Sequence, residues 1–311
     1  MKKISVVIPC YNDSNSVSRM RERLIKIFSN QLPMYDYEII FVDDCSPDNT
    51  WLEIKKSCDI DKKCKGVHNA HNFGVFRNIF AAMKYGDGDA TFMVLGDLQD
   101  SPEYLPEFVK HWENGYQVVI GQRLNTYNKH FTRLARWLYY KLIEKLSKKQ
   151  FREGVNGFGL YDKSFIKILN DIEDIQPILP GIISEFVHKL KIIPVQQEKG
   201  DRETSGLNFW NRYDTAMISL TSYTKTLLRV IMFIGAIIGV FSIAFAIWII
   251  INKIIAWDSF PVGIPAIIVG MFFLGSIQLF FLGVIGEYIL SMNNRSIRRP
   301  IVVVDETINM D

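Results

Sequence analysis

The sequence predicts an α/β fold with a mostly parallel sheet, followed by two helices that cross a membrane. Short β-branched runs alternate with amphipathic segments in the first part of the chain, which is typical of strand–helix–strand units. Polar clusters follow three of these runs. From residue 227 to residue 292 charge almost disappears, leaving only Arg229, Lys253, Asp258 and Glu287.

The predicted strands are 4–9, 38–42, 91–95 and 117–120, and the predicted helices are 16–28, 50–58, 76–84 and 102–114. The first apolar run is too short for a signal peptide and is interrupted at Tyr11, so we interpret it as a buried strand. Four cysteines without a Cys-x-x-Cys spacing favour a reduced compartment. A net charge of +3 is too small to indicate nucleic-acid binding.

The polar clusters at 11–13, 43–48 and 96–100 each follow a predicted strand. Parallel sheets bind ligands at the carboxyl ends of their strands, so the three clusters predict one site. Asp43 and Asp44 can accept hydrogen bonds from a base N–H and from ribose hydroxyls. Helix capping is the alternative; it explains Ser46 and Asp48 but not the two preceding acids, and both readings can hold.

The cluster after the third strand predicts a metal site. Asp97 is the expected carboxylate ligand of a divalent cation that neutralises a departing diphosphate, with Gln99 as a neutral oxygen donor. For Asp100 and Ser101 we favour a different role, the capping of the helix that Pro102 opens.

Two amphipathic segments are expected at a membrane surface. Apolar residues in 131–146 recur at the spacing of one helix face, and basic residues fill much of the remainder. A domain helix with a solvated basic face explains this pattern equally well by itself, but the hydrophobic segments downstream favour the interface. We therefore assign an interfacial helix at about 130–149 and a second interfacial segment at 205–226.

Residues 227–251 and 264–290 are each long and apolar enough to span a bilayer, and the short link between them predicts a helical hairpin. Basic residues flank the outer ends of the pair, at Lys225 and Arg229 and at Arg295, Arg298 and Arg299. This bias predicts that both termini, the 1–204 domain and a 293–311 tail lie in the cytosol. The alternative, two core helices of a soluble protein, would require a much larger protein around them.

Four arginines are candidates for binding phosphate, because the guanidinium group can bind it through two parallel hydrogen bonds. They are Arg123, Arg133, Arg136 and Arg202. Surface solvation explains any one of them. As a group close to the predicted bilayer, they suit an anionic lipid head.

Several motifs in order resemble the inverting family 2 glycosyltransferases with a GT-A fold, of the polyprenyl-phosphate (dolichol-phosphate mannose synthase) type. They are VVIPCYN at 6–12, FVDDCSPD at 41–48, HNFG at 71–74, DLQDSPE at 97–103, GFGLY at 157–161, and QLFFLGVIGEY at 278–288 with RRP at 298–300. The resemblance covers essentially the whole chain. Each motif alone is weak evidence, but the ordered set is specific.

The resemblance implies transfer of one sugar from a nucleotide-sugar, with UDP favoured, to a polyprenyl phosphate in the inner membrane. It implies nucleotide contacts from Pro9, Tyr11, Asn12, Asp43, Asp44, Asn72, Gly74 and Asp97. Asp97 and Gln99 would hold Mg²⁺ or Mn²⁺, and Arg123, Arg133, Arg136 and Arg202 would contact phosphates. A homo-oligomer is a further expectation from the membrane-anchored relatives.

The chain departs from the family pattern at two places. Leu95 stands where many relatives carry the first acid of an Asp-x-Asp pair, and NGFGL at 156–160 stands where many carry GDFRL or GFRL, so that the Asp and the Arg are both absent. These departures leave a non-catalytic, membrane-anchored nucleotide-sugar binder as a rival. A processive polysaccharide synthase is a weaker rival, because RLARW at 133–137 only partly matches the Gln-x-x-Arg-Trp motif and two spans cannot form a polymer channel.

Overall fold

The computed structural model describes residues 1–124, 155–174, 179–198, 264–296 and 299–310, together with isolated positions between 235 and 255. The chain divides into two units. The first contains 1–144, 149–207 and 298–311, and the second contains 145–148 and 208–297.

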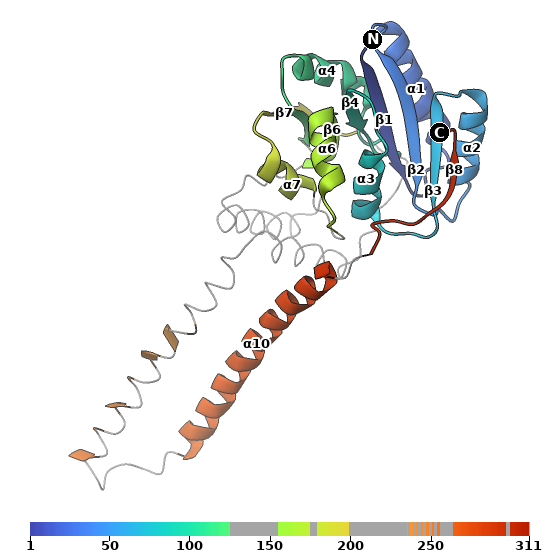
Figure 1. The fold of residues 1–311 in the computed structure, drawn as a ribbon. Helices are drawn as coiled ribbons and strands as arrows, with labels where there is room; N and C mark the ends of the chain where they lie inside the picture. Colours follow the sequence, from blue (N-terminus) through green and yellow to red (C-terminus); the bar gives the residue numbers. More distant parts are fainter. Residues whose placement is uncertain are drawn as a thin grey trace. The chain divides into compact units, whose positions relative to one another are not determined.

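The first unit is built on one sheet with the strand order β7-β5-β6-β4-β1-β2-β3-β8 (Figure 1). The strands are β1 (Lys3–Cys10), β2 (Asp36–Asp43), β3 (Cys64–Asn69), β4 (Ala90–Met93), β5 (Val118–Arg123), β6 (Val155–Asp162), β7 (Leu190–Val195) and β8 (Val304–Ile308). Pairing is parallel except where β6 joins β4 and β5 and where β8 joins β3. The strands other than β6 and β8 therefore share one direction, and their carboxyl ends lie along one edge, here called the carboxyl edge.

Helices cover both faces of this sheet. They are α1 (Val17–Asn30), α2 (Thr50–Ile60), α3 (Val75–Lys84), α4 (Leu105–Glu113), α6 (Lys163–Asp171) and α7 (Leu179–Phe186), with a 3₁₀ turn η1 (Pro102–Tyr104) before α4. Side chains alternate along each strand, so Val6 belongs to a buried cluster with residues of α1, α2 and α4, while Val7 belongs to a second cluster with residues of α3, α6 and α7. The result is an α/β fold with a mostly parallel sheet, as the sequence predicted, and helices on both faces.

The four predicted strands and four predicted helices are confirmed. The sequence reading missed β3, β6, β7 and β8, and also α6 and α7. β6 contains Gly157 and Gly159, which weaken a strand signal, and β8 (VDETI) is polar because it lies exposed at the sheet edge. The chain after residue 293, which we had interpreted as a simple tail, thus contributes a strand to the sheet.

In the second unit, α10 (Ile264–Ser296) confirms the second predicted apolar helix. At 1.5 Å per residue it is about 50 Å long, more than a hydrocarbon core of about 30 Å requires. Its stretch Phe273–Leu290 has a mean hydropathy of 1.7, and it is the one helix among the described residues that is long and apolar enough to cross a membrane. Most of the predicted span 227–251, and the interfacial segments 130–149 and 205–226, lie outside the described residues.

Candidate active site at the carboxyl edge

The three polar clusters meet at the carboxyl edge, as predicted. The loop after β1 contacts the loop after β2, because Asn12 N donates to Ser46 Oγ at 3.0 Å and Asp13 N donates to Thr50 Oγ1 at 2.8 Å. It also contacts the loop after β4, where Gly96 N donates to the carbonyl of Pro9 at 3.1 Å. Backbone and side-chain hydrogen bonds therefore fix the three loops against one another.

Each of these loops contains one residue in the left-handed backbone region. They are Asn12 (φ 56°), Cys45 (φ 55°) and Leu98 (φ 57°), and the fourth such non-glycine residue in the described part of the chain is Asn309. Asparagine adopts this conformation readily, whereas cysteine and leucine do so at a cost of about 1 kcal/mol. Strained backbone of this kind concentrates at functional sites, where surrounding contacts hold it in place.

Asp43 ends β2 with its side chain fully buried. One carboxylate oxygen accepts from the hydroxyl of Ser46, and the other accepts from Ser46 N at 3.2 Å and lies 2.8 Å from His68 Nδ1. Burial raises the pKa of Asp43, while the hydrogen bonds from Ser46 and His68 lower it in part. The carboxylate is thus held rigidly at the strand end where nucleoside recognition was predicted.

Asp44 shapes the next loop. Its carboxylate accepts from Asn69 Nδ2 at 2.9 Å, from Phe73 N at 3.0 Å and from Gly74 N at 2.8 Å. Asn72 Oδ1 also accepts from Gly74 N, at 2.9 Å. The predicted nucleotide residues Asn72 and Gly74 are therefore brought to the side chain of Asp44, which positions their loop.

The N-cap of α2 is Asn49, which makes no side-chain capping bond, so neither Ser46 nor Asp48 is the N-cap residue. The Asp48 carboxylate nevertheless accepts from the backbone N–H of Thr50, the first residue of α2, at 3.0 Å. Ser46 instead directs its hydroxyl to Asp43.

Asp97 follows β4 and is 8% exposed. Its carboxylate accepts from Gln99 N at 3.1 Å, and the side-chain oxygen of Gln99 accepts from Gln197 Nε2 at 2.6 Å. A second buried carboxylate lies beside this turn, since a Cβ on Gly96 would come within 2.9 Å of Asp13 Oδ2. Asp13 belongs to the cluster that the sequence indicated, but we had not assigned it to the site.

These oxygens fit a hard divalent cation that takes only part of its coordination from the protein. The described residues contain no group of three or more His, Cys, Asp or Glu side chains able to hold a metal ion. Asp97 would be the main protein ligand, Asp13 lies near it, and Gln99 already uses its side-chain oxygen. The remaining ligands would come from donor phosphates and water.

The predicted capping role for Asp100 and Ser101 is wrong. The residue before η1 makes no side-chain capping hydrogen bond, because tertiary partners engage both side chains. Asp100 accepts from Arg123 Nε at 2.8 Å and from Nη2 at 2.7 Å, and Asn156 Nδ2 donates to it at 3.0 Å. Burial alone would lower the pKa of Arg123, but these bonds raise it, so the guanidinium stays charged.

The bond pattern leaves one side of Arg123 available. Asp100 uses the Nε and Nη2 atoms, and within the described residues Nη1 has no hydrogen-bond partner. A guanidinium can bind a second anion through its Nη1–Nη2 edge. The structure therefore places a partly buried, fixed cation on the carboxyl edge. The other predicted arginines, Arg133, Arg136 and Arg202, lie outside the described residues.

The departure at Gly159 has a steric reason. A Cβ at this position of β6 would lie 2.4 Å from the carbonyl oxygen of Val119 on the neighbouring strand. The arginine that many relatives carry here would not fit this packing, and Gly159 lets β5 and β6 approach closely.

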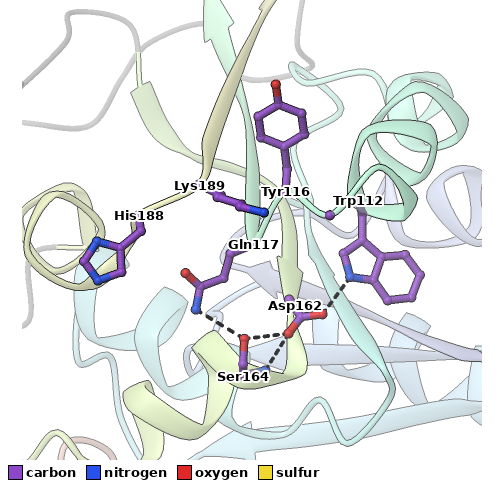
Figure 2. A pocket seen from close by; sticks show the side chains of 8 residues that line it. Trp112, Tyr116, Gln117, Asp162, Ser164, His188 and Lys189 are labelled. Atoms are coloured by element: carbon purple, nitrogen blue, oxygen red, sulfur yellow. Dashed lines mark hydrogen bonds between the residues drawn. The ribbon is translucent and has the colours of Figure 1, made fainter.

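An open pocket of about 360 Å³ lies elsewhere, where β5 and β7 begin and β6 ends (Figure 2). Asp162, which lines it, accepts from Trp112 Nε1 at 2.8 Å and from Ser164 N at 2.8 Å, the latter capping α6. This pocket is at the opposite, amino edge of the sheet, and its acid has a structural role. It does not belong to the candidate site.

Residues 5–169, more than half of the chain, match the family described as glycosyl transferase family 2. The chain is 28% identical to the bactoprenol glucosyl transferase of Shigella phage SfV, over 97% of this chain and 98% of that protein. It is 27% identical to the undecaprenyl-phosphate 4-deoxy-4-formamido-L-arabinose transferase of Proteus mirabilis, over 100% of this chain and 95% of that protein.

Among solved structures, glucosyl-3-phosphoglycerate synthase of Mycobacterium tuberculosis, in complex with Mn²⁺, UDP-glucose and phosphoglyceric acid, superposes with a TM-score of 0.54. The identity is 15%, and the match covers 71% of this chain and 79% of that one. At this identity the similarity supports the fold alone.

Proposed function

The chain belongs to glycosyl transferase family 2 and is a glycosyltransferase; from this we propose that it transfers one sugar from a nucleotide-sugar to the phosphate of a membrane polyprenyl lipid. Both relatives described above are named for transfer to such lipids. We further propose UDP as the nucleotide and Mg²⁺ or Mn²⁺ as the cofactor: the buried carboxylate of Asp97 suits a hard divalent cation, and a neighbour of the same fold is solved with UDP-glucose and Mn²⁺.

One observation carries the choice of a membrane acceptor. Every segment that the sequence assigns to the membrane is attached at the carboxyl edge. The 130–149 segment is inserted between the end of β5 and the start of β6, and the 205–292 segment between the end of β7 and the start of β8. Asp43, Asp97 and Arg123 lie on that same edge, so chain connectivity supports a substrate that stays in the bilayer.

The proposed chemistry is a direct displacement with inversion. An oxygen of the acceptor phosphate attacks the anomeric carbon, the bond from that carbon to the diphosphate breaks, and the nucleoside diphosphate leaves. The acceptor phosphate is already ionised near neutral pH, so no strong general base is required. A divalent cation at Asp97 would supply charge neutralisation for the departing diphosphate. Asp43 and the loop held by Asp44 orient the nucleoside, and Arg123 presents a fixed positive charge to phosphate.

The position of β8 supports a two-span topology. β8 and the strands β1–β7 belong to the same sheet, so all eight lie on one side of any membrane that α10 crosses. The chain between them must then cross an even number of times. We propose that the second crossing is the apolar stretch 227–251, with the catalytic domain and both termini in the cytosol.

The test is incubation of membranes containing the full chain with a panel of nucleotide-sugars, followed by mass spectrometry of the extracted lipids. We expect one donor to give a polyprenyl-phosphate sugar, and Asp97→Ala to abolish it while Asp305→Asn, at an exposed acid on β8, does not. Donor binding without any glycolipid, from every donor tested, would favour the non-catalytic binder instead.

A further inference from the structure

Strand β8 closes the sheet with the residues that follow the membrane helix. It pairs with β3 in antiparallel register, which sets Glu306 opposite His68. The carbonyl of Val303 accepts from Ala70 N at 2.9 Å, just before the loop that Asp44 positions. At the other end, Asn309 Nδ2 donates to the carbonyls of Cys58 at 3.1 Å and Cys64 at 2.8 Å. Bonds therefore fix β8 at both ends.

Glu306 fixes an aromatic side chain of α2. Its carboxylate accepts from Trp51 Nε1 at 3.0 Å and from Lys55 Nζ at 2.7 and 2.8 Å. Because Lys55 neutralises the charge of Glu306, the main effect of Glu306 on the surrounding side chains is to fix their positions. The carboxylate holds the indole N–H and thereby sets the orientation of the ring.

The indole in turn fixes His68. The two rings stack with centroids 4.9 Å apart and an interplanar angle of 22°. Gly66 makes room for this arrangement, because a Cβ there would lie 3.1 Å from the Trp51 ring. His68 Nδ1 then lies 2.8 Å from Asp43 Oδ2. A continuous series of contacts thus runs from β8 through Trp51 and His68 to the strand-end carboxylate.

We propose that Glu306 is a positioning residue of the donor site, which orients Trp51 so that His68 holds Asp43 in the geometry that binds the nucleoside. The proposal rests on the proposed function, since it takes Asp43 to be a nucleotide contact. The segment that follows the membrane helix α10 thereby has a role in the site, because β8 carries Glu306 and so helps to hold Asp43 in position.

Hydrogen exchange in the full-length protein tests the series of contacts without any ligand. The reporter is the amide of Ser46, which donates to the same Asp43 oxygen that His68 contacts. We expect the peptide containing Ser46 to exchange roughly fivefold faster in Glu306→Ala, and faster still in His68→Ala. Asp305→Asn removes an equal charge from the adjacent position of β8 and should leave the exchange unchanged. Equal exchange in Glu306→Ala and Asp305→Asn would overturn the proposal.

Binding of UDP to the same variants gives a second measurement. Glu306→Ala should raise the Kd for UDP by roughly threefold to tenfold, and Glu306→Gln, which keeps an acceptor for the indole N–H, should restore most of the affinity. The double variant Glu306→Ala/His68→Ala should be no weaker than His68→Ala alone, because both act through one series of contacts. Fully additive losses would contradict the proposal. If the wild type forms no glycolipid, the proposed function fails, while the exchange comparison still decides the role of Glu306.

Discussion

Both edges of the sheet bury acidic side chains, but they balance the charge differently. Towards the amino edge, Glu38 lies 2.9 Å from both Lys3 Nζ and Lys65 Nζ and accepts from Ser5 Oγ at 2.5 Å. At the carboxyl edge, Asp100 is likewise paired with a cation, Arg123, but among the described residues Asp43 and Asp44 interact with hydroxyl, amide and imidazole groups. A buried acid therefore does not by itself mark a functional site.

The difference lies in what remains for a ligand. Glu38 lies between two cations, whereas at the carboxyl edge Nη1 of Arg123 has no hydrogen-bond partner within the part of the chain that the structure describes. Three of the four non-glycine left-handed residues in the described part of the chain, Asn12, Cys45 and Leu98, lie in carboxyl-edge loops, whereas the fourth, Asn309, follows β8 at the amino edge. The Glu38 ion network at the amino edge thus stabilises the fold, whereas the Arg123 guanidinium at the carboxyl edge can still bind an anion.

The largest effect that this contrast predicts is at Asp97. Replacing it with Asn should lower the rate of glycolipid formation by about 10²- to 10³-fold, because the departing diphosphate loses its main charge neutralisation. The thermal midpoint should change little. Rates measured with saturating donor and increasing Mn²⁺ would check this; full activity of the variant would remove Asp97 from the site.

Asp100→Asn should affect both stability and activity. It leaves the Arg123 guanidinium without its carboxylate, and breaking a buried pair in this way costs about 3 kcal/mol. Removing the cation as well, in Asp100→Asn/Arg123→Met, should recover part of the thermal stability but not the activity. If the double variant is no more stable than the single one, the ion pair is not the source of the loss.

Asp44→Ala would test whether this acid mainly positions its loop. We expect a loss of about 2 kcal/mol in stability, since among the described residues Phe73 N loses its acceptor, while Asn69 Nδ2 and Gly74 N each lose one of two acceptors. Peptides covering 69–74 should exchange hydrogen faster, and the Kd for UDP should rise. Weaker UDP binding with unchanged exchange would instead assign Asp44 to direct nucleotide contact.

At the amino edge, Glu38→Gln should change stability but not activity. Burial would raise the pKa of Glu38, but the bonds from Ser5, Lys65 and Lys3 lower it from its usual value of 4.5. The stabilisation is therefore complete above that value and is lost as the pH falls through the lowered pKa. Thermal melts should show the variant to be less stable than the wild type by about 1 kcal/mol at pH 7, and this difference should shrink as the pH falls below 4.5.

The smallest effect is expected at Cys45, where φ is 55°. Glycine adopts this conformation without steric cost, so Cys45→Gly should raise stability by about 0.5 kcal/mol with little change in activity. Cys64→Gly, within β3, is the contrasting control and should destabilise. If Cys45→Gly melts at a lower temperature than the wild type, the contacts of the thiol stabilise the fold by more than the relief of backbone strain does.

Much of the fold could be predicted because its strands are apolar runs with polar ends. The same rule located Asp43, Asp44 and Asp97, since the carboxyl ends of parallel strands must meet. It could not find the partners of these residues. Capping was predicted for Asp100 from its local sequence, but a tertiary contact to Arg123 overrides it, and β8 pairs with a strand more than two hundred residues away in sequence.

Because β8 belongs to the sheet of the first unit, that unit is not formed by one continuous stretch of the chain. A shortened chain ending near residue 204 would retain every predicted site residue yet leave β3 as an open edge with unpaired backbone groups. Such edges template association with other chains. We therefore expect this shortened chain to aggregate. Adding residues 303–310, either fused through a linker or as a separate peptide, should prevent the aggregation.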